Sequence, residues 1–210
     1  MEPKEKAKIT FADLLKADGV EETSVLRSPR LGFMGYHGGE LEKVTDIVAA
    51  EAAERSGASY YGVTQAFDPV HHISSTQIDP AASEQLTAFI EHVDAVITIH
   101  GYGLKTQWKT LLLGGRNREL AAHVASRLRP ALPGYEMVDD LDEIPKRLRG
   151  QHEKNPVNLP PQHGLQIELP PTIRWNVDGH HWSDYGEGGR APHTEDLISA
   201  LAAAATEWIG

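Results

Sequence analysis

Short apolar runs alternate with amphipathic stretches along most of this chain. Residues 31–36, 95–99 and 165–169 are short apolar runs of the length typical of buried strands, and the third of them also contains Gln166 and Glu168. By the same patterns, further strands are predicted at 59–67, 73–78 and 110–115, and helices at 11–16, 40–55, 82–91, 117–128 and 194–208. Because strands and helices alternate, the sequence predicts a layered α/β domain with a mostly parallel or mixed sheet.

Apart from the short helix predicted at 11–16, all predicted elements lie in residues 31–210. Residues 1–30 are expected to form a peripheral segment, and residues 31–210 a single domain, since one hydrophobic core commonly serves chains of this length. Residues 135–163 are rich in proline and resemble a loop. Residues 175–193 form a long irregular stretch whose aromatic side chains favour an ordered lid over a disordered segment.

Composition and charge narrow the class of function. The net charge of −10, from 20 basic and 30 acidic residues, argues against a nucleic-acid partner. No stretch approaches the ~20 apolar residues of a membrane span, and the charged start lacks the apolar core of a signal peptide. We therefore expect a cytoplasmic protein with no membrane partner. Since there is no cysteine, a bound metal would need imidazole and carboxylate ligands alone.

Two histidines and two glutamates lie at the ends of the apolar runs. His37 and His100 each follow such a run directly, Glu40 comes three residues after His37, and Glu168 lies within the third run. Ligands of α/β sheets bind at the carboxyl ends of strands. A catalytic zinc takes three protein ligands and lowers the pKa of a water molecule to about 7. His37, Glu40 and His100 supply such a set, which leaves Glu168 as the general base.

Other interpretations of these residues stay open at this point. The spacing of His37 and Glu40 could arise by chance in a chain with 11 histidines, and His100 could be a hydrogen-bonded core residue. Glu168 could form a structural ion pair with Arg174. Residues 105–129 carry six basic residues against one acidic residue, which indicates either a solvated helix face or a place where an anionic ligand is guided to the site.

Several short motifs together resemble a known family. They are His37-Gly-Gly-Glu40, His72-Ile-Ser-Ser-Thr76, Ile99-His100-Gly101, Gly114-Gly115, Asn155-Pro-Val-Asn158 and Gly164-Leu-Gln-Ile-Glu168-Leu, followed by Arg174. In this order, over residues 31–174, they resemble the poly-γ-glutamate hydrolase family of phage and bacterial origin. That family is similar in turn to zinc carboxypeptidases, in which a strand ending in Ile-His supplies the third zinc ligand and a later Glu-Leu supplies the base.

The resemblance implies a fold, a cofactor and a reaction. It implies a three-layer α/β sandwich with a mixed, mostly parallel sheet, zinc as cofactor, and hydrolysis of γ-glutamyl amide bonds in poly-γ-glutamate. The substrate would be an anionic polyamide, with His72, Arg116, Arg174 and Tyr185 as expected substrate-binding residues and Lys105 as a further candidate. Without a signal peptide, such a protein would meet an extracellular polymer only after release by lysis or by another export route.

Two other functions remain as alternatives. One is a zinc amidohydrolase or carboxypeptidase that acts on small N-acyl amino acids or peptides and holds a single substrate carboxylate with one arginine. The other is a non-catalytic domain of the same fold that binds anionic glycans or peptides. The two enzyme hypotheses differ in the chain length of the substrate. A non-catalytic binding domain would have no need of Glu168. The sequence leaves the oligomeric state open.

Overall fold

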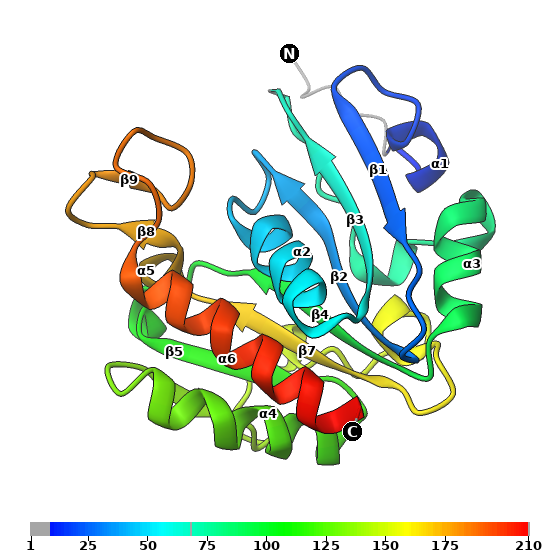
Figure 1. The fold of residues 1–210 in the computed structure, drawn as a ribbon. Coiled ribbons are helices and arrows are strands. Elements are labelled where there is room, and N and C mark those ends of the chain that lie inside the picture. Colours follow the sequence, from blue (N-terminus) through cyan, green and yellow to red (C-terminus); the bar gives the residue numbers. More distant parts are fainter. Residues whose placement is uncertain (1–8, 68, 210) are drawn as a thin grey trace.

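A seven-stranded mixed sheet forms the centre of the protein in a computed structural model that describes residues 9–67 and 69–209. The strands run in the order β1-β3-β2-β4-β7-β5-β6 across the sheet (Figure 1). Their bounds are Val20–Val25 (β1), Leu31–Gly39 (β2), Ser59–Gln65 (β3), Ala95–Gly101 (β4), Thr110–Gly114 (β5), Glu136–Val138 (β6) and Gly164–Leu169 (β7). The four central strands, β3, β2, β4 and β7, are parallel, whereas β1 and β5 run antiparallel to their central neighbours.

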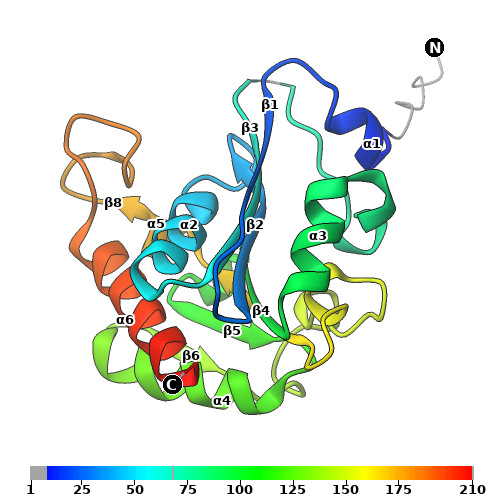
Figure 2. The ribbon, with the colours of Figure 1, turned by 45° about the vertical axis from the view of Figure 1, so that its right-hand side comes forward.

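Helices cover both faces of this sheet. One face carries α2 (Thr45–Ser56), α4 (Arg118–Ala131) and α6 (Pro192–Ile209), and the other carries α1 (Phe11–Leu14) and α3 (Glu84–His92) (Figures 1 and 2). Each face buries its own hydrophobic cluster, because alternate side chains of a strand point to opposite sides. The protein is thus a three-layer α/β sandwich with a mixed sheet, as predicted.

The alternation along β4 determines which layer holds the polar residues. Ile97 and Ile99 belong to the cluster under α2, α4 and α6, while Val96 belongs to the cluster under α3. His100 follows the parity of Val96, so its imidazole lies on the α3 side of the sheet. Short 3₁₀ turns rather than long helices cover this end of the sheet, and they leave room for a site. Among them are η1 (Ser75–Gln77), η2 (Pro80–Ala82), η4 (Lys146–Leu148) and η5 (Pro156–Asn158).

The structure corrects three predictions of secondary structure. Residues 73–78, predicted as a strand, contain the turn η1 and lead directly into η2, where Asp79 is the cap and Pro80 has no N–H for a sheet ladder. Helix α2 begins at Thr45 rather than residue 40, after a turn in which Val44 has a φ of 79°. The segment 135–163 contains the short strand β6, whose three residues carry too little pattern to be recognised.

The boundary predicted at residue 30 also differs from the structure. β1 pairs with β3 at the edge of the sheet, and Phe11 and Leu14 are buried in the cluster beneath α3. The described part of the first thirty residues therefore belongs to the domain. Its strand was missed because β1 reads Val-Glu-Glu-Thr-Ser-Val, a polar sequence that an edge position tolerates.

The aromatic stretch after residue 174 is ordered by a small hairpin and a network of ion pairs. After α5 (Pro171–Arg174), the strands β8 (Trp175–Asn176) and β9 (His181–Trp182) pair antiparallel. Arg190 then binds Glu51 of α2 and Glu195 of α6. Within the described ranges, no helix is both long and apolar enough to cross a membrane.

Candidate active site

Two histidines meet at the carboxyl ends of β2 and β4. A bulge in β2 makes this possible: Gly35 pairs with Gly62 and Gly38 with Thr64, so three steps on β2 match two on β3. The extra residue brings Tyr36 and His37 to the same side of the sheet, with ring centroids 5.0 Å apart. The ring centroids of His37 and His100 are then 4.9 Å apart, and both imidazoles are buried.

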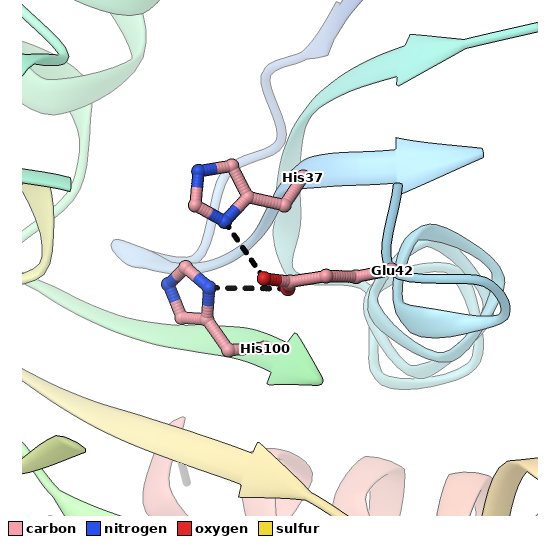
Figure 3. A group of neighbouring side chains, drawn as sticks. All are labelled: His37, Glu42 and His100. Atoms are coloured by element: carbon pink, nitrogen blue, oxygen red, sulfur yellow. Dashed lines mark hydrogen bonds and ion pairs between the residues drawn. The ribbon is translucent and has the colours of Figure 1, made fainter. Parts of the chain in front are cut away.

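Glu42 completes this cluster from the turn that leads into α2. Its backbone N–H donates to the carbonyl of His37, which folds the chain back toward the strand. One carboxylate oxygen lies 3.0 Å from Nδ1 of His37, and the other lies 3.3 Å from Nδ1 of His100 and accepts the N–H of Gly101 at 2.8 Å. Figure 3 shows the carboxylate facing one nitrogen of each ring, with the other ring nitrogens pointing away. Three separate segments thus converge on one point.

The carboxylate in the cluster is Glu42, and not Glu40 as the sequence had suggested. β2 continues through Gly39, so His37 and Glu40 are separated by extended chain and not by a helical turn. Glu40 donates its N–H to the carbonyl of Gln65, and its carboxylate forms an ion pair with Lys43 at 2.8 Å on the surface. The chain needs two more residues to turn before a carboxylate can reach His37.

The hydrogen bonds of His37 leave the lone pair of its Nδ1 free to bind a metal ion. Nε2 of His37 lies 2.8 Å from the carbonyl oxygen of Ile73, which can only accept, so Nε2 carries a proton. In the neutral ring the lone pair of Nδ1 then faces the Glu42 carboxylate, an arrangement that needs a proton or a cation between the two groups. A carbonyl behind the imidazole is also a usual outer partner of a metal-bound histidine. Two imidazole nitrogens and a carboxylate therefore fit a zinc ion.

The electrostatics of the cluster agree with this fit. Burial by itself would raise the pKa of Glu42, but the two histidines hold it far below its usual value. Burial would likewise lower the pKa of His37, yet the charge and hydrogen bond of Glu42 raise it. The cluster therefore keeps an ionised carboxylate beside the imidazole of His37, whose pKa that carboxylate raises, and a bound divalent cation would balance the same negative charge.

Glu168 faces this cluster from the neighbouring strand. It pairs in register with His100, is 5% exposed, and accepts a hydrogen bond at 2.8 Å from the side-chain amide of Gln166. Burial raises the pKa of Glu168 to about 7. A carboxylate with such a pKa can both take and return a proton near neutral pH. The alternative ion pair with Arg174 is not formed, because the Arg174 guanidinium donates to the carbonyl of Lys43 instead.

A cleft of about 690 Å³ opens over the cluster and Glu168. Its remaining walls come from residues 72–76 on one side and 146–155 on the other. Lys146 and Arg147 of η4 line it with exposed side chains, and neither forms an ion pair with any residue that the structure describes. Within the described residues, Glu42 and Glu168 are the acidic groups of the lining. The cationic groups at the cleft therefore come from a segment that the sequence pattern presented as loop.

The basic stretch at 105–129 lies elsewhere. The Arg118 guanidinium donates hydrogen bonds to backbone carbonyls, Arg127 forms an ion pair with Glu207, and Arg129 forms one with Asp139. Arg116 is exposed, does not line the cleft, and donates to the carbonyl of Gln151 at 3.0 Å. These contacts agree with the interpretation of residues 105–129 as a solvated helix face rather than as a place where an anionic ligand is guided to the site.

Of the other expected substrate residues, His72 lines the cleft, with its ring centroid 4.9 Å from that of His37. Arg174 is 5% exposed, lies 5.0 Å from the ring of Trp182, and donates to the carbonyl of Lys43 at 2.8 Å; burial lowers its pKa to about 10. Tyr185 lies beside Lys43, whose ammonium is 5.2 Å from its ring. Arg174 and Tyr185 thus contact the turn that carries Glu42 and do not line the cleft.

Four residues of the site were not singled out from the sequence: Glu42, Tyr36, Asn155 and Gln166. Gln166 had a usable signal, because residues two apart in a strand share a face and a glutamine therefore accompanies Glu168. Asn155 appeared only as part of a motif. Tyr36 shares the parity of Met34, so regular alternation already places it on the α3 side of the sheet. The bulge in β2, which the sequence pattern does not reveal, is what brings His37 to the same side.

Comparisons with known proteins agree with this fold. The sequence profile of the poly-gamma-glutamate hydrolase family matches residues 14–181. The SPbeta prophage-derived UPF0714 protein YoqZ of Bacillus subtilis (strain 168) is 32% identical over 142 residues, 67% of this chain and 48% of that protein. UPF0714 protein YndL of the same organism is 33% identical over 99 residues, 47% of this chain and 37% of that protein. The matches thus span half or less of the length of these relatives.

Solved structures show the same architecture. A bacteriophage poly-γ-glutamate hydrolase superposes with a TM-score of 0.75 at 22% identity, covering 90% of this chain and 89% of that one. The zinc-free apo form of YndL superposes with a TM-score of 0.76 at 19% identity, covering 93% and 95%. These likenesses concern the fold, whereas the profile match covers most of the sequence. This chain belongs to the poly-γ-glutamate hydrolase family.

Proposed function

We propose that this protein hydrolyses the γ-glutamyl amide bonds of poly-γ-glutamate, with zinc held by His37, Glu42 and His100 and with Glu168 as general base. The observation that carries the proposal is the convergence of two Nδ1 atoms and a carboxylate opposite a buried glutamate, at the floor of a cleft. Membership of a hydrolase family supports the same reaction class.

The proposed chemistry divides between the metal and the chain. A zinc ion at this position would polarise the amide carbonyl and lower the pKa of the attacking water. Glu168 takes a proton from the water as its oxygen bonds to the amide carbon, and returns a proton to the amide nitrogen as the carbon–nitrogen bond breaks. The hydrogen bond from Gln166 occupies one oxygen of Glu168 and leaves the other for the proton.

The lining of the cleft suits a polymer with one carboxylate per residue. Lys146 and Arg147 offer cationic groups without an acidic partner among the described residues, and His72 adds a third nitrogen-bearing side chain near the cluster. A substrate carboxylate can therefore bind there without breaking an existing ion pair. This local charge offsets the overall charge of −10, which by itself would repel a polyanion.

The test is incubation of the purified protein with high-molecular-weight poly-γ-glutamate, with zinc and again after chelation, while the size of the polymer is followed. We expect shortening that chelation abolishes and zinc restores. Binding of zinc without shortening would contradict the proposed substrate and favour a small N-acyl amino acid. Absence of both would contradict the proposal altogether.

A matched pair of variants tests the base. Glu168→Gln should bind zinc as the wild type does and lose about 10²- to 10⁴-fold in turnover, the usual contribution of a general base. Glu143→Gln is the control, because Glu143 is exposed and lies outside the cleft lining. Turnover by Glu168→Gln at the wild-type rate would refute the role of Glu168.

A further inference from the structure

We propose that Asn155 is a positioning residue that aligns both halves of the site, the metal ligand His100 and the base Glu168, through one directional chain of hydrogen bonds. This inference rests on the proposed function, because it assigns roles relative to zinc and to the base. It concerns side chains on four separate segments that meet beneath the cleft, all of them buried: Tyr36, His100, Asn155, Gln166 and Glu168.

The chain runs without interruption from one end of the site to the other. Nε2 of His100 lies 3.0 Å from the hydroxyl of Tyr36, and that hydroxyl lies 3.3 Å from Oδ1 of Asn155. The amide nitrogen of Asn155 donates to Oε1 of Gln166 at 2.8 Å. The amide nitrogen of Gln166 in turn donates to Oε1 of Glu168 at 2.8 Å.

Two backbone groups that also bond to the side-chain amides of Asn155 and Gln166 determine the direction of this series of hydrogen bonds. Asn155 is the N-cap of η5, and its Oδ1 accepts the backbone N–H of Val157 at 3.2 Å. Since a backbone N–H can only donate, Oδ1 of Asn155 must lie on that side and the amide nitrogen must face Gln166. The amide nitrogen of Gln166 also lies 3.4 Å from the carbonyl of Leu148, which can only accept. Both amides are therefore oriented independently of each other, and they agree.

This direction has a consequence for each half of the site. Because Oδ1 of Asn155 only accepts, the proton of the Tyr36 hydroxyl points to Asn155, and Tyr36 must accept from Nε2 of His100. His100 is thereby held in the tautomer whose Nδ1 lone pair faces Glu42, as a metal ligand requires. At the other end, Gln166 presents N–H to Glu168 and so holds one of its oxygens as an acceptor.

Asn155→Asp tests the direction of the chain with almost no change in shape. Aspartate caps a turn as well as asparagine does, and it still accepts from Val157 and Tyr36, but it has no N–H for Gln166. The Gln166 amide must then turn over and present its oxygen to Glu168. We expect turnover to fall about 10- to 100-fold, the usual loss for an outer partner, while the Kd for zinc, measured by competition with a chromophoric chelator, stays near the wild-type value.

Two further variants separate the two halves. Tyr36→Phe removes the acceptor of Nε2 of His100, and we expect the Kd for zinc to rise about 10- to 100-fold. Asn155→Ala removes all three hydrogen bonds of the Asn155 side chain, those with Tyr36, Gln166 and Val157, so that zinc binding and turnover should both weaken. A residue with only a structural capping role would give a different pattern, in which Asn155→Asp resembles the wild type in every measurement.

A stability cycle tests the same chain without substrate. The midpoint of thermal unfolding is measured at mildly alkaline pH for Asn155→Asp in three backgrounds: wild type, Glu168→Gln and Gln166→Met. In the wild-type background we expect Asn155→Asp to lower the midpoint, because the Gln166 oxygen then faces the Glu168 carboxylate. The drop should be smaller in the other two backgrounds, because Glu168→Gln removes that carboxylate and Gln166→Met removes that oxygen. An equal drop in all three backgrounds, or a drop that persists with Gln166→Met, would overturn the proposal and indicate only the burial of a charge.

The proposal and the function on which it rests can fail separately. If the wild type hydrolyses polymer and Asn155→Asp does so at the same rate, the chain is overturned and the proposed function stands. If the wild type shows no chelator-sensitive hydrolysis, the proposed function fails. The zinc affinities and the unfolding cycle then still support or overturn the proposed role of Asn155.

Discussion

Glu42→Gln and Glu40→Gln make a sharp test of the metal centre, because the two glutamates are two residues apart and differ completely in their contacts. Glu42 is directed at Nδ1 of both histidines and is nearly buried, whereas Glu40 pairs with Lys43 and its side chain is 35% exposed. Replacing Glu42 removes one of three proposed ligands and its charge. Replacing Glu40 removes a surface ion pair worth about 0–1 kcal/mol.

The expected magnitude follows from linkage between binding and folding. At a free zinc concentration of about 100 times Kd, a site that exists only in the folded state stabilises it by about 2.7 kcal/mol. For a domain of this size, about 1 kcal/mol corresponds to roughly 2–4 °C in Tm, so zinc should raise the Tm of the wild type by about 5–11 °C. If Glu42→Gln weakens zinc binding at least about 100-fold, as loss of a ligand should, most of this rise disappears at the same zinc concentration.

The assay is thermal unfolding with and without zinc, together with the Kd for zinc from chelator competition. Glu40→Gln should keep both the affinity and the zinc-dependent rise in Tm, and Glu42→Gln should lose both. Retention of wild-type affinity by Glu42→Gln, with loss in Glu40→Gln, would refute the reasoning and restore the pairing of His37 with the residue three positions later.

Three further predictions concern the cleft, the surface network and the core. Replacing Lys146 and Arg147 together by alanine should raise KM for the polymer about 2- to 30-fold, from two exposed ion pairs of about 0.2–1 kcal/mol each, and the effect should shrink at high salt. A hydrogen bond from Arg55 lowers the pKa of Glu195 to about 2 from the usual 4.5. The ionised Glu195 carboxylate therefore stabilises the fold above pH 4.5, and this contribution is lost as the pH falls toward 2. The difference in Tm between wild type and Glu195→Gln should narrow over that range. Ile97→Ala should lower the free energy of unfolding, measured with denaturant, by about 2–5 kcal/mol, because Ile97 is fully buried on the central strand β4.

Each of these has a control or a contrary outcome. Arg116→Ala is the control for the cleft variant, since Arg116 is exposed outside the lining and should leave KM unchanged. A Tm difference for Glu195→Gln that stays constant down to pH 3 would contradict the assigned pKa direction. A cost below about 1 kcal/mol for Ile97→Ala would show that the core collapses around the missing atoms.

The sequence pattern located the main elements because they obey simple periodicities. β2 and β4 are nearly continuous apolar runs, and β7 is apolar except for Gln166 and Glu168; such runs belong to strands that are covered on both faces. His37 and His100 stood out because an imidazole at the end of such a run is seldom without a partner. Elements without a period were missed: β1 is polar because it lies at an edge, and β6 has only three residues.

The sequence by itself therefore determined the layered α/β architecture, the family, and the strands that carry His37, His100 and Glu168. These depend on local hydrophobic periodicity and on motifs that can be read in order along the chain. Only the tertiary structure decided that Glu42 and not Glu40 reaches the imidazoles, and that Asn155 links the two halves of the site. A bulge, a turn with positive φ and the approach of distant segments set those contacts, and none of these geometries leaves a period in the sequence.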